Sequence, residues 1–307
     1  MKTNRLRRTL LWAKGHKPEE VRLALESNAD CIVFECEDMV VPPEKEAALQ
    51  GAAQAMRTLN FYGKERIIRP NDITTERGKR DLEVILPCRP DALRLPKCED
   101  VGVLLELDRR LTDYEREQGW PENSIELILT LETPRGIRLA YEMASCCDRI
   151  TGMGLGAGDL TSAMGVDRDL TPGSLQLLYA KQKMIMDGKE AGVQLFDTTV
   201  LCKDMNSDSL DAFIREDTMA NKAYGITGRS VSMLRHIDII NGVYAPSAEE
   251  VKLAEKIISG YEDGVKAGLS EIFVEGHFVD APVIHKQQEV LNMERMIRER
   301  QALRQQS

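Results

Sequence analysis

Short apolar runs alternate with longer amphipathic segments along most of the chain. The runs lie at residues 9–12, 31–34, 67–68, 93–95, 125–131, 150–154, 193–196 and 226–231. Segments with a helical spacing of apolar residues follow several of them, at residues 18–27, 43–59, 174–190 and 209–224. Because both faces of a parallel sheet are covered, its strands read as short continuous apolar runs. The pattern therefore predicts a series of strand–helix units in a parallel sheet.

The number of these units indicates the fold class. About eight strand–helix alternations follow one another with no linker between them, and a (β/α)₈ barrel typically takes ~250 residues. No sequence repeat, low-complexity tract or second domain interrupts the series. We therefore expect an α/β fold, a (β/α)₈ TIM barrel, as a catalytic domain over residues 1–268.

The remaining residues, 269–307, fall outside that barrel. Their last part is a charged helix with a narrow apolar stripe formed by Val290, Leu291, Met293, Met296 and Ile297. A stripe of this kind needs a surface to cover it, and its own barrel or another subunit is a commoner partner than a membrane. We expect a C-terminal helical extension that serves oligomerisation and reaches a neighbouring subunit.

Composition narrows the class of protein. The 307 residues are 42% hydrophobic and 30% charged, and no apolar stretch is long enough to span a bilayer. The net charge of -9 argues against nucleic-acid binding, which depends on clustered Lys and Arg. The basic start of the chain lacks the apolar region and cleavage site of a signal peptide, and the seven cysteines form no CxxC pair. We expect reduced thiols and a cytoplasmic protein.

Polar residues follow most of the predicted strands. They are Glu35, Glu37, Asp38, Arg69, Asn71, Lys97, Glu132, Asp159 and Asp197. In α/β barrels the carboxyl ends of the strands meet at one rim, where ligands bind. One such residue would be explained by exposure or by helix capping, but nine predict a catalytic pocket.

Residues 128–160 carry the most informative pair of these. Glu132 and Asp159 end consecutive apolar runs, each followed by a helix, so they would converge on one point. Paired carboxylates are hard oxygen ligands that suit Mg²⁺. The alternative is an N-cap at each helix start. We favour the metal site.

Two cationic residues complete the predicted pocket. Arg69 can clamp a substrate carboxylate with its planar fork, or pair with Glu37 or Asp38, and both roles can hold at once. Lys97 could form a Schiff base, which would make the protein a covalent aldolase. The alternative for Lys97 is an ion pair with a neighbouring carboxylate, and we favour it because a metal site is already predicted.

Other catalytic motifs are excluded. Residues 152–157 nominally fit the dinucleotide fingerprint G-x-G-x-x-A, but the acidic partner expected about 20 residues on would fall near Leu177, inside a helix. The four histidines lack metal-ligand spacing, and no serine sits in a G-x-S-x-G elbow. We expect the glycines to let the backbone approach a ligand and to place Asp159.

Together the motifs resemble those of one family, the HpcH/HpaI aldolase and citrate lyase β-subunit superfamily, on its CitE-like side. The stretches that carry the resemblance span almost the whole chain: Arg8 to Gly15 for R-S-x-L-F-V-P-G, Glu35 to Lys45 for D-L-E-D-x-V and its following lysine, Arg69 to Asn71 for R-x-N, Pro96 to Glu99 for P-K-x-E, Glu132 to Gly136 for E-T-P-R-G, Gly156 to Asp159 for G-x-x-D, and Asp280 to Pro282 for D-x-P.

The resemblance implies a Mg²⁺-dependent TIM-barrel carbon–carbon lyase that assembles as a homotrimer or homohexamer. It implies a general acid/base at Asp280, supplied by the C-terminal segment of a neighbouring subunit. With the rim pattern it yields the candidate residues: for catalysis Asp280, Arg69, Glu37 and Asp38; for substrate binding Arg69, Lys45, Lys97, Gly156, Ala157 and Gly158; for the metal Glu132 and Asp159.

Two stretches differ from relatives that act on CoA thioesters. Those relatives carry I-H-P-x-Q-I, whereas residues 232–237 read S-M-L-R-H-I, with His236 in place of the glutamine. The first helix carries Glu19 and Glu26 where CoA-using relatives can place lysines, and a loss of cations weakens binding of a multiply charged ligand. The sequence leaves open whether the second substrate is a CoA thioester, an acyl-carrier thioester or an aldehyde without CoA.

The expected reaction is an aldol or retro-aldol step. We expect cleavage or formation of a 3-hydroxy acyl or hydroxy-acid substrate that yields a 2-oxo acid such as pyruvate, glyoxylate or oxaloacetate. Mg²⁺, with Mn²⁺ as an alternative, would act as a Lewis acid. Two other functions stay open: a thioester hydrolase on the same site, and a non-catalytic subunit that keeps the barrel as a scaffold. We expect no nucleic-acid or membrane partner.

Overall fold

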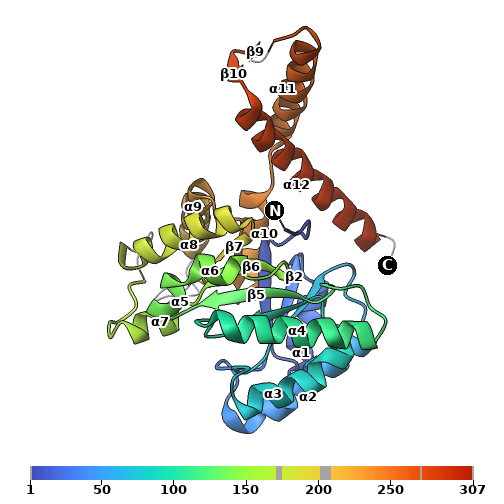
Figure 1. Ribbon diagram of the computed structural model, residues 1–307, viewed down its shortest axis with the longest axis vertical. Coiled ribbons are helices and arrows are strands. Elements are labelled where there is room, and N and C mark those ends of the chain that lie inside the picture. Colours follow the sequence, from blue (N-terminus) through green and yellow to red (C-terminus); the bar gives the residue numbers. More distant parts are fainter. Residues whose placement is uncertain (1, 171–174, 201–208, 270–271, 306–307) are drawn as a thin grey trace. The chain divides into compact units, whose positions relative to one another are not determined.

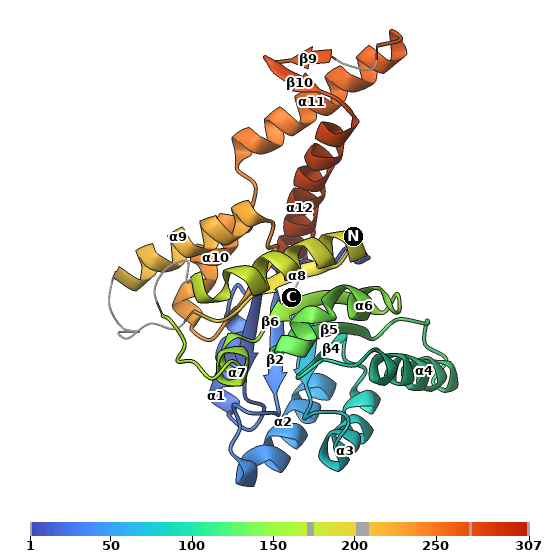
Figure 2. The same cartoon turned by 60° about the vertical axis from the view of Figure 1, so that its left-hand side comes forward.

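Eight strands pair in parallel, each with the next along the chain, and the eighth pairs with the first to close a barrel. This computed structural model describes residues 2–170, 175–200, 209–269 and 272–305. It divides into two compact units, Met1–Asn241 and Gly242–Ser307. The barrel forms the first unit, and Figures 1 and 2 show its helices arranged around the outside of the strands.

The elements follow the predicted alternation. The strands are β1 (Thr9–Ala13), β2 (Cys31–Glu35), β3 (Glu65–Arg69), β4 (Ala92–Leu95), β5 (Glu126–Leu131), β6 (Ile150–Leu155), β7 (Gln194–Asp197) and β8 (Gly228–Val231). The helices are α1 (Pro18–Glu26), α2 (Lys45–Thr58), α3 (Glu76–Ile85), α4 (Val101–Glu117), α5 (Pro134–Arg138), α6 (Ala140–Ser145), α7 (Ala157–Ala163), α8 (Leu178–Ala191), α9 (Ser209–Tyr224) and α10 (Ile237–Tyr244). The expected (β/α)₈ fold is confirmed.

Alternate residues of the strands fill the inside of the barrel. The apolar centre is formed by Leu10, Cys31, Val33, Ile67, Ala92, Ile128 and Phe196, with Trp12 packed against it. Because side chains alternate between the faces of a strand, the residues two positions further along β2, β3 and β4 also point inward. Those residues are Glu35, Arg69 and Arg94, so a charged layer lies above the apolar centre, toward the carboxyl ends of the strands.

An arginine closes the opposite end of the barrel. Arg7, just before β1, is buried, and its guanidinium donates hydrogen bonds to Glu65 at 2.6 and 2.7 Å and to Glu126 at 2.6 Å. It also donates to Thr151 at 2.9 Å. These partners lie at the starts of β3, β5 and β6. The charge of Arg7 is therefore compensated inside the amino-terminal rim, and the open rim is the carboxyl one.

The second unit contains two long helices and a hairpin. It comprises α11 (Ala248–Lys266), β9 (Ile272–Val274), β10 (His277–Val279) and α12 (Ala281–Gln305). A capping box between Ser247 and Glu250 starts α11. Gly260 and Gly264 let the hairpin lie on that helix, since a Cβ there would come within 2.7 Å of Val274 and 2.6 Å of Ile272.

The boundary between the units lies earlier than the expected one at residue 268. The division falls at Asn241, and α11 is grouped with the hairpin and α12. Sequence periodicity could not separate α11 from the barrel helices, because both kinds of helix carry one apolar stripe. The hairpin was not anticipated. Among the described residues, no helix is long and apolar enough to cross a membrane.

Candidate active site

The two predicted metal ligands lie at the ends of neighbouring strands. Glu132 directly follows β5, and Asp159 stands in the first turn of α7, which follows β6. These strands are paired, with Leu131 opposite Leu155. Between them, Gly156 faces Glu132 so closely that a Cβ at that position would lie 2.4 Å from Oε2. A glycine is therefore required here for the carboxylate to keep its place.

Glu132 is a buried carboxylate in an unusual electrostatic position. Only 1% of the residue is exposed, and its Oε1 accepts the backbone N–H of Lys97 at 2.6 Å. Burial raises the pKa of Glu132 to about 7, and the charges of Asp159 and Glu37 act in the same direction. The Lys97 N–H and the charge of Arg69 oppose this shift. A bound cation would stabilise the ionised form that burial disfavours.

The donor set suits Mg²⁺ better than a soft metal. Mg²⁺ is usually held by one or two carboxylates together with waters and substrate oxygens, which is what Glu132 and the exposed Asp159 offer. Within the described parts of the chain, no three His, Cys, Asp or Glu side chains come together as a metal-binding group. A closed protein cage of the zinc type is therefore absent from those parts.

The guanidinium of Arg69 forms ion pairs inside the barrel, and one of its nitrogens remains available to a ligand. Its Nε donates to Glu35 at 2.7 Å, and Nη1 lies 3.4 Å from Glu37. Its guanidinium carbon lies 4.7 Å from the ring centroid of Trp12, a cation–π distance. Its expected partner Asp38 is not among these contacts. Among the described residues, Nη2 of Arg69 donates no hydrogen bond, so it can receive a ligand carboxylate.

Lys97 forms the ion pair that we favoured over a Schiff base. Its Nζ donates to Glu37 at 2.8 Å and to Asp38 at 3.0 Å. Partial burial lowers the pKa of the Lys97 amine, but the hydrogen bonds to these two carboxylates outweigh it and raise the pKa above its usual value. The amine is held protonated, which is the wrong state for a nucleophile.

Three further candidates occupy the same rim in different ways. Lys45, at the start of α2, donates to Asn71 Oδ1, and Asn71 Nδ2 donates to the Cys36 carbonyl at 2.9 Å. Ala157 is buried, whereas Gly158 is exposed with open space where a side chain would be. Lys45 therefore lies near Asn71 and Asp38, whereas Ala157 and Gly158 belong to the same helix turn as Asp159.

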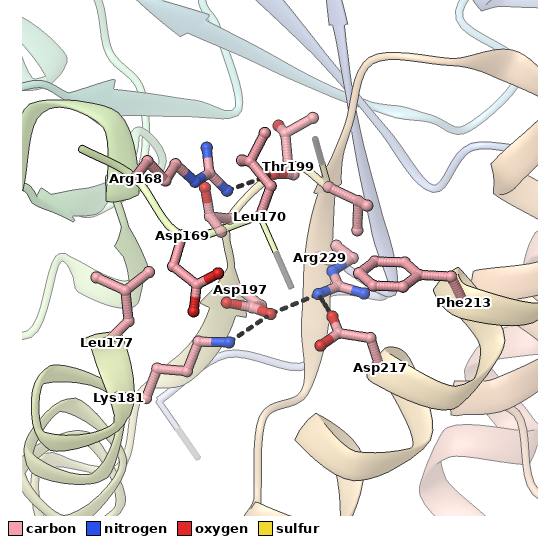
Figure 3. Close-up of a pocket in the computed structure, with 12 residues that line it drawn as sticks. Arg168, Asp169, Leu170, Leu177, Lys181, Asp197, Thr199, Phe213, Asp217 and Arg229 are labelled. Atoms are coloured by element: carbon pink, nitrogen blue, oxygen red, sulfur yellow. Dashed lines mark hydrogen bonds and ion pairs between the residues drawn. The ribbon is translucent and has the colours of Figure 1, made fainter. Parts of the chain in front are cut away.

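Asp197 does not belong to this rim, which corrects the sequence prediction. Phe196 points into the barrel core, so the next residue of β7 faces outward, toward the helices. Asp197 accepts hydrogen bonds from Arg229 at 2.6 Å and Lys181 at 3.2 Å, and Arg229 also binds Asp217 (Figure 3). The cluster lines a small separate cavity between β7, β8 and their helices.

Arg94, in the middle of β4, is the charged residue that the rim pattern missed. Its Nη1 donates to Ser230 at 2.8 Å, and its guanidinium carbon lies 4.7 Å from the Trp12 ring centroid. Burial lowers the pKa of Arg94 to about 10, and the charge of Arg69 adds to this shift. The sequence does contain a sign of this residue, because an arginine inside a short apolar run is unusual for a buried strand.

A cavity of about 350 Å³ opens beside this layer. Trp12 and Glu35 form its wall toward the barrel, and its apolar lining includes Leu11, Leu23, Met39 and Leu234. Among the described residues that line it, Lys14 is the one cation, and the carboxylate Glu20 also belongs to the lining. On α1, Arg22 is bound by Glu19 at 2.6 Å and Glu26 at 2.7 Å. The cavity is therefore apolar, with little net charge.

Asp280 lies in the second unit, between β10 and α12. Its Oδ1 accepts the backbone N–H of Val283 at 3.2 Å, which is the geometry of a helix N-cap. This cap keeps the side chain near the hairpin, where Phe273 and Phe278 stack edge to face with ring centroids 5.7 Å apart. Phe273 is 75% exposed.

Comparison with known proteins confirms the resemblance seen in the motifs. Citrate lyase subunit beta of Leuconostoc mesenteroides subsp. cremoris is 32% identical over 293 residues, 95% of each chain. Citrate lyase subunit beta of Escherichia coli K12 is 30% identical, over 94% of this chain and 93% of its own. A crystal structure of CitE from Mycobacterium tuberculosis, in complex with magnesium, acetoacetate and coenzyme A, has the same fold, with a TM-score of 0.69, 21% identity, and coverage of 96% and 99%. The family's sequence model matches residues 8–233, and the chain belongs to the HpcH/HpaI aldolase/citrate lyase family.

Proposed function

We propose that this protein is a Mg²⁺-dependent carbon–carbon lyase that cleaves a 3-hydroxy acyl thioester into a shorter thioester and a 2-oxo acid. The observation that carries the proposal is the convergence of Glu132, Asp159 and Arg69 at one rim of the barrel. Two carboxylates for a hard cation beside an arginine for a carboxylate match a 2-oxo acid, which presents a carboxylate and an adjacent oxygen. The similarity to citrate lyase beta subunits supports the same reaction class.

Each residue has a distinct role in this proposal. Bound Mg²⁺ supplies Lewis acidity at the oxygen next to the substrate carboxylate. Glu132 and Asp159 hold the cation, and Gly156 leaves the space that Glu132 needs. Arg69 directs Nη2 to the substrate carboxylate while Glu35 fixes its Nε. Lys97 holds Glu37 and Asp38 in place and orients Glu132 through its backbone N–H.

We place the acid/base step on Asp280 of a neighbouring subunit, in a homotrimer or homohexamer. Breaking the bond next to the 3-hydroxy carbon requires a group that removes the hydroxyl proton and a group that protonates the released carbon. The carboxylates of the barrel rim already have other partners in this proposal: Glu132 and Asp159 bind the cation, Glu35 pairs with Arg69, and Glu37 pairs with Lys97. A carboxylate carried by the C-terminal unit supplies what the rim lacks.

The apolar cavity beside Trp12 is the proposed place for the thioester arm. Its lining suits an alkyl chain with few charges, and α1 offers only an arginine already held by two glutamates. A free nucleotide with several phosphates requires clustered cations. We therefore favour a thioester carried by an acyl-carrier domain over free CoA.

The test is an assay of both products with matched thioesters. The full-length protein is incubated with Mg²⁺ and a 3-hydroxy-3-carboxy acyl thioester on CoA or on an acyl carrier. A lyase releases a 2-oxo acid while the thioester bond survives. A thioester hydrolase releases a free thiol without an oxo acid, and a scaffold subunit neither binds Mg²⁺ calorimetrically nor releases either product. Either of the last two outcomes overturns the proposal.

A further inference from the structure

Six arginines of the described chain are buried: Arg7, Arg8, Arg69, Arg94, Arg149 and Arg229. Five of them pair with a carboxylate: Arg7 with Glu65, Arg8 with Asp30, Arg69 with Glu35, Arg149 with Glu115, and Arg229 with Asp197. Arg94 has no carboxylate within ion-pair distance in the part of the chain that the structure describes. An unpaired charge is costly to bury, so its retention at this position calls for an explanation.

The surroundings hold the Arg94 guanidinium still without neutralising it. Nη1 is bound to Ser230, and Nε lies 3.5 Å from Thr130 Oγ1, at the limit of a hydrogen bond. Nη2 faces Gly154, where a Cβ would approach it to 2.9 Å. Trp12 covers the group from another direction. All of these neighbours are uncharged.

The group lies just below the proposed metal site. Gly154, in β6, faces Nη2, and Gly156, which directly follows β6, faces Glu132. Two residues of extended chain span about 7 Å. The charge of Arg94 interacts with Glu132 and Glu35. Glu35 is already bound to Arg69, and Glu132 would be neutralised by a bound cation. The positive charge of Arg94 then remains without compensation beneath the substrate.

We propose that Arg94 is a specificity-determining residue, whose fixed positive charge below the metal site favours oxo acids with a second carboxylate over oxo acids with one. This inference rests on the proposed function. The attraction grows in proportion to the charge of the ligand and is strong where water is excluded. A dicarboxylate ligand therefore gains more from Arg94 than a monocarboxylate does. The competing explanation is that Arg94 only fills the barrel and anchors Ser230 and Trp12.

The decisive variant is Arg94→Met, which removes the charge and keeps an unbranched apolar side chain at that position. Replacing buried ionic groups by apolar ones is often tolerated, so we expect a folded protein. Affinities for Mg²⁺ alone, and for oxaloacetate and pyruvate in the presence of Mg²⁺, are measured by calorimetry. We expect the affinity for oxaloacetate to fall about tenfold more than that for pyruvate. Affinity for Mg²⁺ alone should rise, because a neighbouring positive charge has been removed.

Two further variants separate charge from packing. Arg94→Lys keeps the positive charge but lacks the planar guanidinium. It should retain most of the preference for oxaloacetate over pyruvate. Ser230→Ala removes the hydrogen bond to Nη1, keeps the charge, and should also retain the preference. A packing role makes the opposite prediction for Arg94→Met: Mg²⁺ and both acids bind more weakly, with an unchanged ratio. That result overturns the inference, and so does an Arg94→Lys variant that loses the preference.

Failure of the proposed function has a different signature. If Glu132→Gln binds Mg²⁺ as tightly as the unaltered protein, the metal site itself is misplaced. If Mg²⁺ binding requires Glu132 while Arg94→Met leaves the ratio of the two acids unchanged, only the role of Arg94 is wrong. Should Arg94→Met fail to fold, Arg94→Gln provides an uncharged variant with a polar end, and the same ratio is measured.

Discussion

At the scale of single residues, neighbours on adjacent elements decide what each rim residue can do. Glu132 is buried and held by one backbone N–H, Asp159 is exposed, and Arg69 is divided between internal carboxylates and an open Nη2. Lys97 is bound by Glu37 and Asp38. These differences separate residues that can bind a ligand from residues that hold others in place.

The metal ligands give the first prediction. Glu132→Gln and Asp159→Asn should each abolish Mg²⁺-dependent activity and leave the fold intact. Each replaces a negatively charged ligand of the cation by a neutral amide of nearly the same shape. Activity is measured over a range of Mg²⁺ concentrations, and folding by circular dichroism. Glu142→Gln, on the exposed face of α6, is the matched control and should behave as the unaltered protein. Full activity in both site variants would exclude the assignment.

The arginine clamp gives the second prediction. Losing one charged bidentate pair typically costs about 2–5 kcal/mol when the partner stays buried. Arg69→Lys should therefore weaken binding of pyruvate or glyoxylate severely, since a lysine ammonium cannot bind Glu35 and a ligand through one planar fork. Binding is measured by calorimetry with Mg²⁺ present. An unchanged affinity would mean that Arg69 serves only as an internal ion pair.

At the scale of elements, the alternation of strand residues decides which charged groups meet. Arg69 and Arg94 point into the barrel from β3 and β4, whereas Asp197 and Arg229 point outward from β7 and β8 and are covered by α8 and α9. The same residue types thus have a ligand-binding role on one face of the sheet and a structural role on the other.

The outward cluster gives the third prediction. Arg229→Met would remove an ion-pair partner of Asp197 and Asp217, both buried, and breaking a buried pair typically costs about 3–5 kcal/mol. We expect a loss of that size in the free energy of unfolding, measured by urea denaturation, and little change in the KM of the folded protein. Arg94→Met is the comparison, because it breaks no ion pair. A large rise in KM with unchanged stability would assign the cluster to the substrate site.

At the scale of the whole molecule, the chain comprises a barrel and a C-terminal unit with its own helix pair and hairpin. The barrel has one open rim, because Arg7 closes the other. The C-terminal unit presents Asp280 beside two exposed phenylalanines on the hairpin. This arrangement suits a segment that completes a site on another copy of the chain.

The shared site gives the fourth prediction. If Asp280 acts on a neighbouring subunit, mixing inactive Asp280→Ala with inactive Glu132→Gln should restore some activity, because mixed assemblies contain sites with neither lesion. Native mass spectrometry of a tagged mixture must first show that subunits exchange. If they exchange and activity stays at the level of the single variants, the shared site is wrong. Asp280 would then only cap α12, a role worth about 1 kcal/mol.

The sequence by itself determined the barrel and the pairing of Glu132 with Asp159. Both follow from local rules: buried parallel strands are apolar, and consecutive strands end at the same rim. It also predicted the positions of Arg69 and Lys97. Arg69 directly follows an apolar run and Lys97 stands two residues after one, so position along the chain was enough to place both.

Only the tertiary structure decided which charged residues reach the rim and which of them are paired. The side a side chain faces, and the charges around it, depend on neighbours that are distant in the chain. Asp197 ends a strand as Glu132 does, but β8 and α8 supply Arg229 and Lys181 on its side of the sheet. Arg94 lies inside an apolar run, and only its neighbours on β5, β6 and β8 show that no carboxylate of the described residues is within ion-pair distance. The grouping of α11 with α12 depends on the direct packing of these two helices, with the hairpin packed on α11. An apolar stripe requires a covering surface, and the fold determines which surface covers it.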